Sequence, residues 1–139
     1  MSACWQHFPH QADIGIVGIA PQLAGAFEQA ALGLTAVICE PQRIQQHTAV
    51  DVICAAPDIE LLLADWLNAL IYEMATRHML FSRYEVHLAG AQLRARAWGE
   101  AVDVARHQPA VEVKGATYTE LKVFQDAQGL WHAQCVVDV

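Results

Sequence analysis

The sequence is poor in charged residues, and poorest in positive ones. Its 139 residues include 8 Lys and Arg against 15 Asp and Glu, giving a formal net charge of −7 with only 17% charged residues. Proteins that bind nucleic acid draw much of their affinity from Lys and Arg side chains on the phosphates. The composition therefore argues against direct strong nucleic-acid binding and favours cations or a basic protein surface as partners.

A long apolar segment and an export signal are also missing. Asp, Glu or Gln interrupts the longest apolar runs well before the roughly 20 residues that cross a membrane. Residues 1–10 contain neither a basic n-region nor an apolar h-region. We therefore expect a cytoplasmic protein without membrane association. With 55% hydrophobic residues, residues 1–139 are long enough for one domain with its own core.

Motifs of the common catalytic classes do not occur. The sequence contains no GxSxG, Walker A, GxGxxG or HExxH pattern. Its four scattered cysteines form no CxxC pair, which predicts free thiols rather than disulfides or a zinc knuckle. Among the seven histidines, only His7 and His10 form a close pair. Their spacing of three on a strand and corner does not place both rings on one side, so a zinc site there is disfavoured.

The strongest structural signal is an amphipathic helix within residues 57–79. Asp58 is placed to cap its N-terminus, and Glu60 lies in the first turn, where the helix dipole favours negative charge. Large apolar residues recur at the spacing of one helical face, at Ile59, Leu62, Leu63, Trp66, Leu67, Leu70, Ile71 and Met74. Burial of this stripe is worth roughly 12–24 kcal/mol before entropy is subtracted. We therefore expect the other elements to pack around this helix.

Shorter periodic segments predict a second helix and about seven strands. The second helix opens at Pro21 and continues through Leu34, whereas residues 98–109 are expected to be irregular. Alternating and β-branched residues predict strands at Trp5–Phe8, Ile14–Ile19, Thr48–Cys54, Tyr84–Leu88, Leu93–Ala97, Val111–Val123 and Trp131–Val137. The pattern predicts an α+β fold, a two-layer sandwich with two main helices on one face of a largely antiparallel sheet.

Two aspartates are candidate ligands of a cation. Asp13 lies in a polar corner between two apolar strands, and Asp138 precedes Val139 at the end of the apolar segment VVDV. The oxygens of Asp138 and Val139 repel one another unless a cation or a lysine lies between them. Oxygen-only ligation is the chemistry of Ca²⁺ or Mg²⁺ rather than of zinc. From spacing alone, a solvated strand end remains the simpler interpretation of Asp138.

Lys114 is a third candidate. It follows Glu112 and Val113 in an apolar segment. A lysine in such surroundings either lays its stem along an edge with the ammonium in water or pairs with buried carboxylates. Both interpretations stay open on the sequence alone.

Five segments in unbroken order resemble the archease family over about residues 8–139. They are HQADIGI, LLLADWLNALIYE followed by LFSRYEV, AWGE, EVKGATYTELKV and the final VVDV. Each segment alone is weak, but their order makes the resemblance specific. Two departures are Gln11 in place of a threonine and Gly115-Ala116 in place of Ala-Val, and neither removes a candidate ligand.

The resemblance implies a metal site and a functional lysine. The aspartate of the family's His-Thr-Ala-Asp motif corresponds to Asp13, and that of its final Asp-Val pair corresponds to Asp138. Val139 is then expected to contribute main-chain oxygen. Lys114 corresponds to a functionally important lysine of the family, and His10 opens the first motif. We expect these last two residues to act in function or partner contact.

The resemblance also implies a function. Archeases are non-catalytic activators or chaperones of the RNA-splicing tRNA ligase and support its guanylylation and multiple turnover in tRNA splicing or RNA repair. We therefore expect a non-enzyme that binds a divalent metal ion, with Ca²⁺ favoured over Mg²⁺ or Mn²⁺. A metal-dependent hydrolase of a small phosphorylated substrate is an alternative, although no base or nucleophile is recognisable beside the carboxylates. A generic adaptor or chaperone of nucleic-acid-modifying enzymes is another.

Overall fold

The computed structural model describes residues 3–139, so Met1 and Ser2, part of the stretch inspected for an export signal, lie outside it. The elements, in chain order, are β1 (Cys4–His10), β2 (Asp13–Ala20), α1 (Leu23–Ile38), the 3₁₀ turn η1 (Pro41–Arg43), β3 (Thr48–Ala55), α2 (Ile59–Arg77), β4 (Met79–Ala89), β5 (Gln92–Ala101), α3 (Val104–His107), β6 (Gly115–Ala116), β7 (Lys122–Gln125) and β8 (Trp131–Asp138). Within residues 3–139, no helix is both long and apolar enough to span a membrane.

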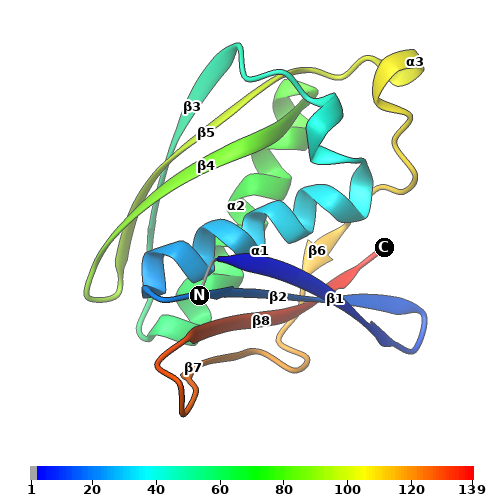
Figure 1. Cartoon of the computed structure of the whole chain (residues 1–139). Coiled ribbons are helices and arrows are strands. Elements are labelled where there is room, and N and C mark those ends of the chain that lie inside the picture. The colour runs from blue at the N-terminus through cyan, green and yellow to red at the C-terminus, as the bar shows by residue number, and fades with distance from the viewer. Residues whose placement is uncertain (1–2) are drawn as a thin grey trace.

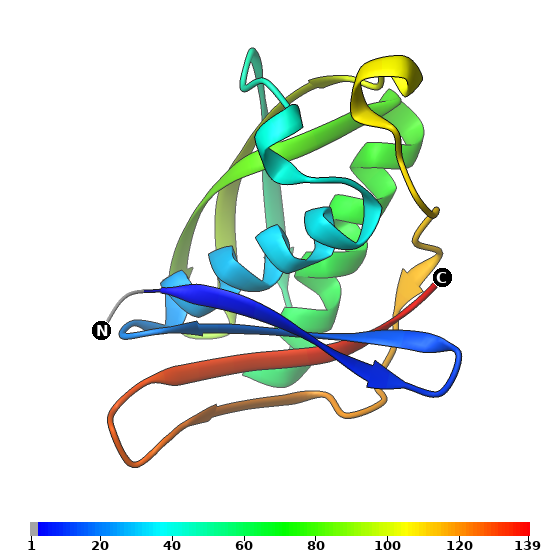
Figure 2. The same ribbon diagram turned by 45° about the vertical axis from the view of Figure 1, so that its right-hand side comes forward.

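The strands form two antiparallel sheets. One has the order β1-β2-β8-β6, with β7 also paired to β8, and the other has the order β3-β5-β4. Helix α1 contacts β2 and β8 of the first sheet and β4 of the second, and α2 also contacts strands of both sheets. The two helices therefore lie between the sheets (Figures 1 and 2). The α+β class and the antiparallel pairing are confirmed, with the strands divided between two sheets.

Helix α2 lies within the predicted residues 57–79 and buries the predicted apolar face. The Asp58 carboxylate accepts a hydrogen bond from the Leu61 N–H at 2.8 Å, as expected of an N-cap. At the other end, His78 takes the left-handed conformation with φ 53° and stops the helix. Six of the eight residues of the predicted stripe are buried, and Ile59 and Ile71 pack against the same core. The helical spacing of the apolar residues was therefore sufficient to predict this helix and its buried face.

The predictions for residues 98–123 were wrong in two places. Strand β5 continues to Ala101 and is followed by the short helix α3, where irregular structure was expected. Residues 111–114 form no strand, and the predicted long strand is reduced to β6 and β7. The chain between β6 and β7 is interrupted by Glu120, whose φ is 55°. A run of β-branched residues shows where a strand is favoured, but pairing with β8 decides which residues form one.

Candidate functional site

The first part of the candidate site is the turn between β1 and β2. The two strands pair in register from Cys4 opposite Ile19 to His10 opposite Asp13. Gln11 occupies the left-handed region with φ 54°, which allows the two-residue turn that brings His10 and Asp13 face to face. The predicted polar corner is thus the tip of a hairpin.

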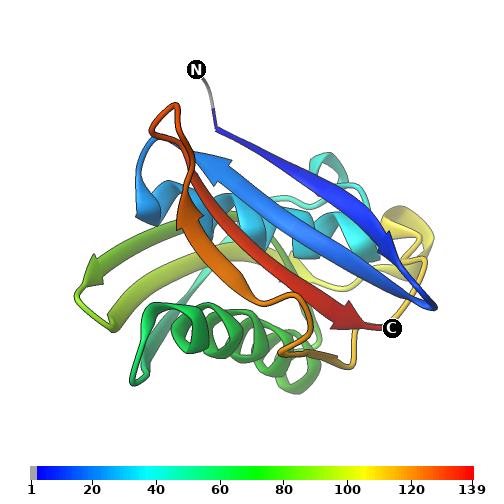
Figure 3. The ribbon, with the colours of Figure 1, turned by 90° about the horizontal axis from the view of Figure 1, so that it is seen from below.

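The end of β8 lies beside this hairpin tip. Strand β2 pairs with β8 as far as Ile14 opposite Val137. Continued by one residue, this register places Asp13 opposite Asp138 at the edge of the ladder. Figure 3 shows the C-terminal end of the chain next to the turn between β1 and β2. Strand pairing therefore brings together two aspartates that are remote in sequence.

Lys114 reaches the same corner from the other side of β8. Strand β6 pairs with β8 through Gly115 opposite Asp138 and Ala116 opposite Val137. The main-chain N–H of Lys114 donates to the carbonyl oxygen of Asp138 at 2.7 Å. We call the group formed by His10, Asp13, Lys114, Asp138 and Val139 the carboxylate corner.

The donor set of the carboxylate corner suits a hard divalent cation. Asp138 and Lys114 are exposed, and Asp13, His10 and Val139 are half-buried, so the carboxylates are open to solvent. Two carboxylates with main-chain oxygens nearby are the ligands that Ca²⁺ and Mg²⁺ prefer, with water completing the coordination. In residues 3–139, no group of three or more His, Cys, Asp or Glu side chains is arranged to hold a metal ion. Protein side chains would thus supply only part of the coordination shell.

The Lys114 ammonium has no carboxylate partner within residues 3–139, since none of the ion pairs there includes it. Its side chain is exposed at the rim of the corner. The position of this side chain matches the first interpretation, a stem along an edge with the charge in water. The ammonium is therefore available to a partner molecule.

His7 takes no part in the carboxylate corner. Its Nε2 lies 2.8 Å from the carbonyl oxygen of Gly33 in α1, and its ring packs against Trp5 with centroids 4.8 Å apart. This histidine therefore ties the edge strand β1 to α1.

One residue of the site region was missed on the sequence. The sequence assigned no role to Asn68, an exposed residue of α2, yet its carboxamide bonds to both main-chain groups of Ala116 in β6. The available signal was its residue type, because asparagine is a poor helix former in the middle of a helix.

A second polar cluster, which shares no residue with the carboxylate corner, secures α3. Glu100 is 9% exposed and accepts hydrogen bonds from Arg106 through both terminal nitrogens at 2.7 Å, from Nε2 of His107 at 2.9 Å and from the Gln45 N–H at 2.7 Å. The bidentate Arg106 contact is the largest cause that holds the pKa of Glu100 well below its usual range. Nδ1 of His107 accepts from the Asp103 N–H at 2.9 Å, so Nε2 carries the proton that Glu100 receives. The cluster is satisfied internally, which indicates a structural role.

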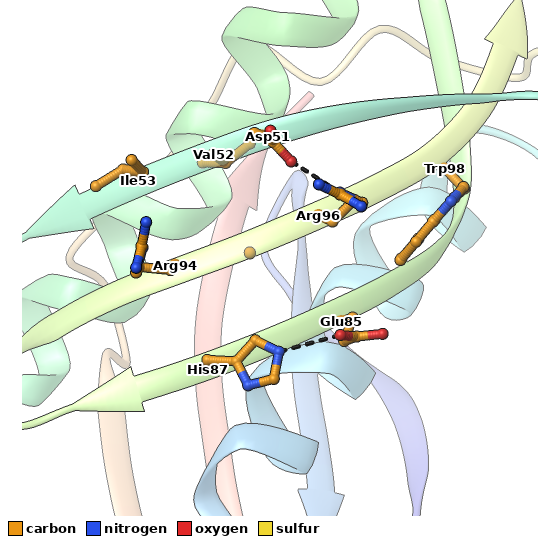
Figure 4. Close-up of a pocket in the computed structure, with 9 residues that line it drawn as sticks. Asp51, Val52, Ile53, Glu85, His87, Arg94, Arg96 and Trp98 are labelled. Atoms are coloured by element: carbon orange, nitrogen blue, oxygen red, sulfur yellow. Dashed lines mark hydrogen bonds and ion pairs between the residues drawn. The ribbon is translucent and has the colours of Figure 1, made fainter.

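The outer face of the sheet β3-β5-β4 carries a shallow hollow of about 370 Å³ (Figure 4). Most of its polar side chains are paired with each other: Arg96 with Asp51 at 2.8 Å and His87 with Glu85 at 3.0 Å. Beside it, Arg83 lies over the ring of Trp98 at 4.3 Å. Side-chain pairs of this kind, across strands for Arg96–Asp51 and Arg83–Trp98 and within β4 for His87–Glu85, are typical of a solvated sheet face. None of the residues predicted to act in function lines this hollow.

Comparison with known proteins gives one consistent match. The sequence model of the Archease protein family (MTH1598/TM1083) matches residues 5–139. A protein archease from Pyrococcus furiosus is 35% identical, over 97% of this chain and 98% of its own. One from Methanosarcina mazei is 31% identical, over 97% and 95%.

Two solved structures share the fold. The solution structure of protein 1598 from Methanobacterium thermoautotrophicum is 27% identical, with a TM-score of 0.85 over 97% of this chain and 98% of its own. The crystal structure of an archease from Thermotoga maritima, described as a possible chaperone, is 18% identical. Its TM-score is 0.59 over 96% of each chain, a likeness of fold alone.

Proposed function

Because the chain belongs to the archease family, we propose that it is a non-catalytic activator of the RNA-splicing tRNA ligase. It promotes guanylylation and multiple turnover of that enzyme in the cytoplasm, during tRNA splicing or RNA repair. The observation that carries this proposal is the carboxylate corner, where strand pairing gathers Asp13, Lys114 and Asp138. These are the residues to which the sequence resemblance assigned function.

A divalent cation belongs to the proposal. Asp13 and Asp138, with main-chain oxygen from Val139, would hold it, and Ca²⁺ suits such an open oxygen site. When bound, the ion would neutralise the charge of the two carboxylates and would bind oxygen atoms of a partner. Asp138 and Val139 would hold it at the end of β8.

Lys114 has a different role in the proposal. An ammonium cannot coordinate a cation, and its charge has no carboxylate partner within residues 3–139. It is therefore placed to contact an anionic group of the ligase or its bound nucleotide next to the corner. The acidic character of the chain, with a net charge of −7, suits docking beside the basic cleft of a nucleotide- and RNA-binding enzyme.

The test is ligase guanylylation and multiple-turnover RNA joining with and without this protein. Asp13→Ala and Asp138→Ala are expected to abolish activation without unfolding the protein. Asp65→Ala is the matched control, because it removes one exposed carboxylate from α2, outside the corner. Divalent-ion affinity is measured in parallel by calorimetry. Full activation by an Asp13→Ala protein that no longer binds the ion would overturn the metal-dependent mechanism.

The same preparations test the alternative that the protein is a hydrolase. Turnover of a panel of phosphoesters that is lost in Asp138→Ala would support a hydrolase and contradict the proposal. Activation of the ligase without phosphoester turnover is the expected result.

A further inference from the structure

Helix α2 supplies the outer edge of β6 and β7 with the hydrogen bonds that a neighbouring strand would otherwise supply. The Oδ1 atom of Asn68 accepts from the Ala116 N–H at 2.9 Å, and its Nδ2 donates to the Ala116 carbonyl oxygen at 3.1 Å. Nearer the start of the helix, the Glu60 carboxylate accepts from the Val123 N–H at 3.3 Å. Figure 3 shows α2 running alongside these short strands, in agreement with the contacts between them.

The two bonds from Asn68 compensate for a missing strand. In an antiparallel ladder, alternate residues turn their main-chain groups toward and away from the partner strand. The Thr117 N–H donates to Val136 of β8 at 2.9 Å, whereas the N–H and C=O of Ala116 face α2. A carboxamide offers the same donor and acceptor as a peptide group. Asn68 therefore pairs both groups of Ala116 at an edge that would otherwise be left open.

The position of Lys114 depends on this short strand. Strand β6 contains only Gly115 and Ala116, and it follows Lys114 directly. Residues 108–114 have no regular secondary structure, and on that side the chain is held by the buried side chain of Val113 and by the bond from the Ala110 N–H to the Ile38 carbonyl oxygen at 2.7 Å. On the other side, Asn68 fixes Ala116 two residues away. The main-chain bond from Lys114 to Asp138 belongs to the same short stretch of pairing.

We infer that Asn68 is a positioning residue of the carboxylate corner. It holds β6 against β8 and so keeps Lys114 beside Asp138. The effect on ligase activation rests on the proposed function, whereas the hold on β6 is a property of this chain alone. Both side-chain hydrogen bonds of Asn68 go to Ala116, outside the corner.

The first experiment measures, without ligase or metal ion, how firmly Asn68 holds β6 against β8. Amide hydrogen exchange of Ala116 is followed by NMR in the wild type, in Asn68→Ala and in the control Glu60→Ala. Asn68→Ala is expected to accelerate exchange at Ala116 about tenfold or more, which corresponds to about 1.4 kcal/mol of opening free energy. Glu60→Ala is expected to accelerate exchange at Val123 and leave Ala116 within about twofold. Unchanged exchange at Ala116 in Asn68→Ala would overturn the inference.

Loss of the helix does not explain the expected result. Alanine is a better helix former than asparagine, so Asn68→Ala favours α2 itself. Protection of the α2 amides should therefore be preserved while β6 opens. A loss of protection throughout α2 would contradict the positioning role.

The second experiment connects the hold on β6 to function. Asn68→Ala is expected to reduce ligase activation at least fivefold, whereas Glu60→Ala stays near the wild type. The double variant Asn68→Ala/Lys114→Ala should be no worse than Lys114→Ala alone, because both changes remove the same placed ammonium. Additive losses of activation in the double variant would refute the positioning of Lys114 by Asn68. Full activation by Asn68→Ala, with faster exchange at Ala116, would refute it as well. Full activation by Lys114→Ala would refute the role of the lysine in the proposed function, and with it the positioning role of Asn68. Exchange at Ala116 would still show whether Asn68 holds β6 against β8.

Discussion

Replacement of Trp66 by alanine is the most direct test of how α2 packs against α1 and β4. Trp66 is 0% exposed and lies where α2 meets α1 and β4. Its Nε1–H donates to the Phe27 carbonyl oxygen of α1 at 3.1 Å. Its ring meets Tyr84 of β4 edge-on, with centroids 6.0 Å apart and an interplanar angle of 84°. One side chain therefore connects three elements.

The expected loss of stability for Trp66→Ala is about 3–5 kcal/mol, the range for removing a large buried aromatic side chain. Within that total, the hydrogen bond to Phe27 accounts for about 1 kcal/mol and the contact with Tyr84 for about 0.5–1.5 kcal/mol. Trp66→Phe keeps an aromatic ring but loses the hydrogen bond and some volume. Its expected loss is roughly 1–3 kcal/mol.

Tyr72→Ala is the matched control, because Tyr72 lies on the same helix and is 64% exposed. Its expected change is within about 1 kcal/mol. Urea unfolding followed by far-UV circular dichroism gives the free energies without depending on tryptophan fluorescence, and the slope of each transition shows whether it stays two-state. A loss below about 1 kcal/mol for Trp66→Ala, or an equal loss for Tyr72→Ala, would refute the assigned packing of α2.

Three further predictions concern the carboxylate corner and the cluster at α3. Lys114→Ala should lose ligase activation while its divalent-ion affinity in calorimetry changes far less than that of Asp138→Ala. A peptide tag appended after Val139 should weaken ion binding by crowding the corner. An unchanged affinity would show that the terminal carboxylate is not a ligand. The lowered pKa of Glu100 means that its contribution to stability is present above its ordinary value near 4.5 and is lost as pH falls through the folded-state pKa. Glu100→Gln should therefore be less stable at pH 7 and should lose less stability than the wild type in acid-unfolding curves below about pH 4.5.

The sequence was sufficient for elements whose signals are local. The period of the apolar residues predicted α2, and Asp58 was recognised as its cap because the capping bond joins residues three apart. Strands β4 and β5 were predicted for the same reason, since the alternation of each lies in one continuous segment. The α+β class followed from these local signals, because it depends on which elements exist rather than on how they pair.

Only the tertiary structure decided how distant segments meet. Asp13, Lys114 and Asp138 share one corner because β8 pairs with β2 along one edge and with β6 along the other. Neither pairing can be predicted from the alternation of residues in a strand, since this alternation shows which face is buried but not which strand lies next to it. From the residues alone Asp138 was a solvated strand end, and its place next to Asp13 was implied only by the resemblance to a family. Asn68 was hidden for the same reason: its partner is a main-chain group 48 residues away, and a main-chain group has no residue type to recognise.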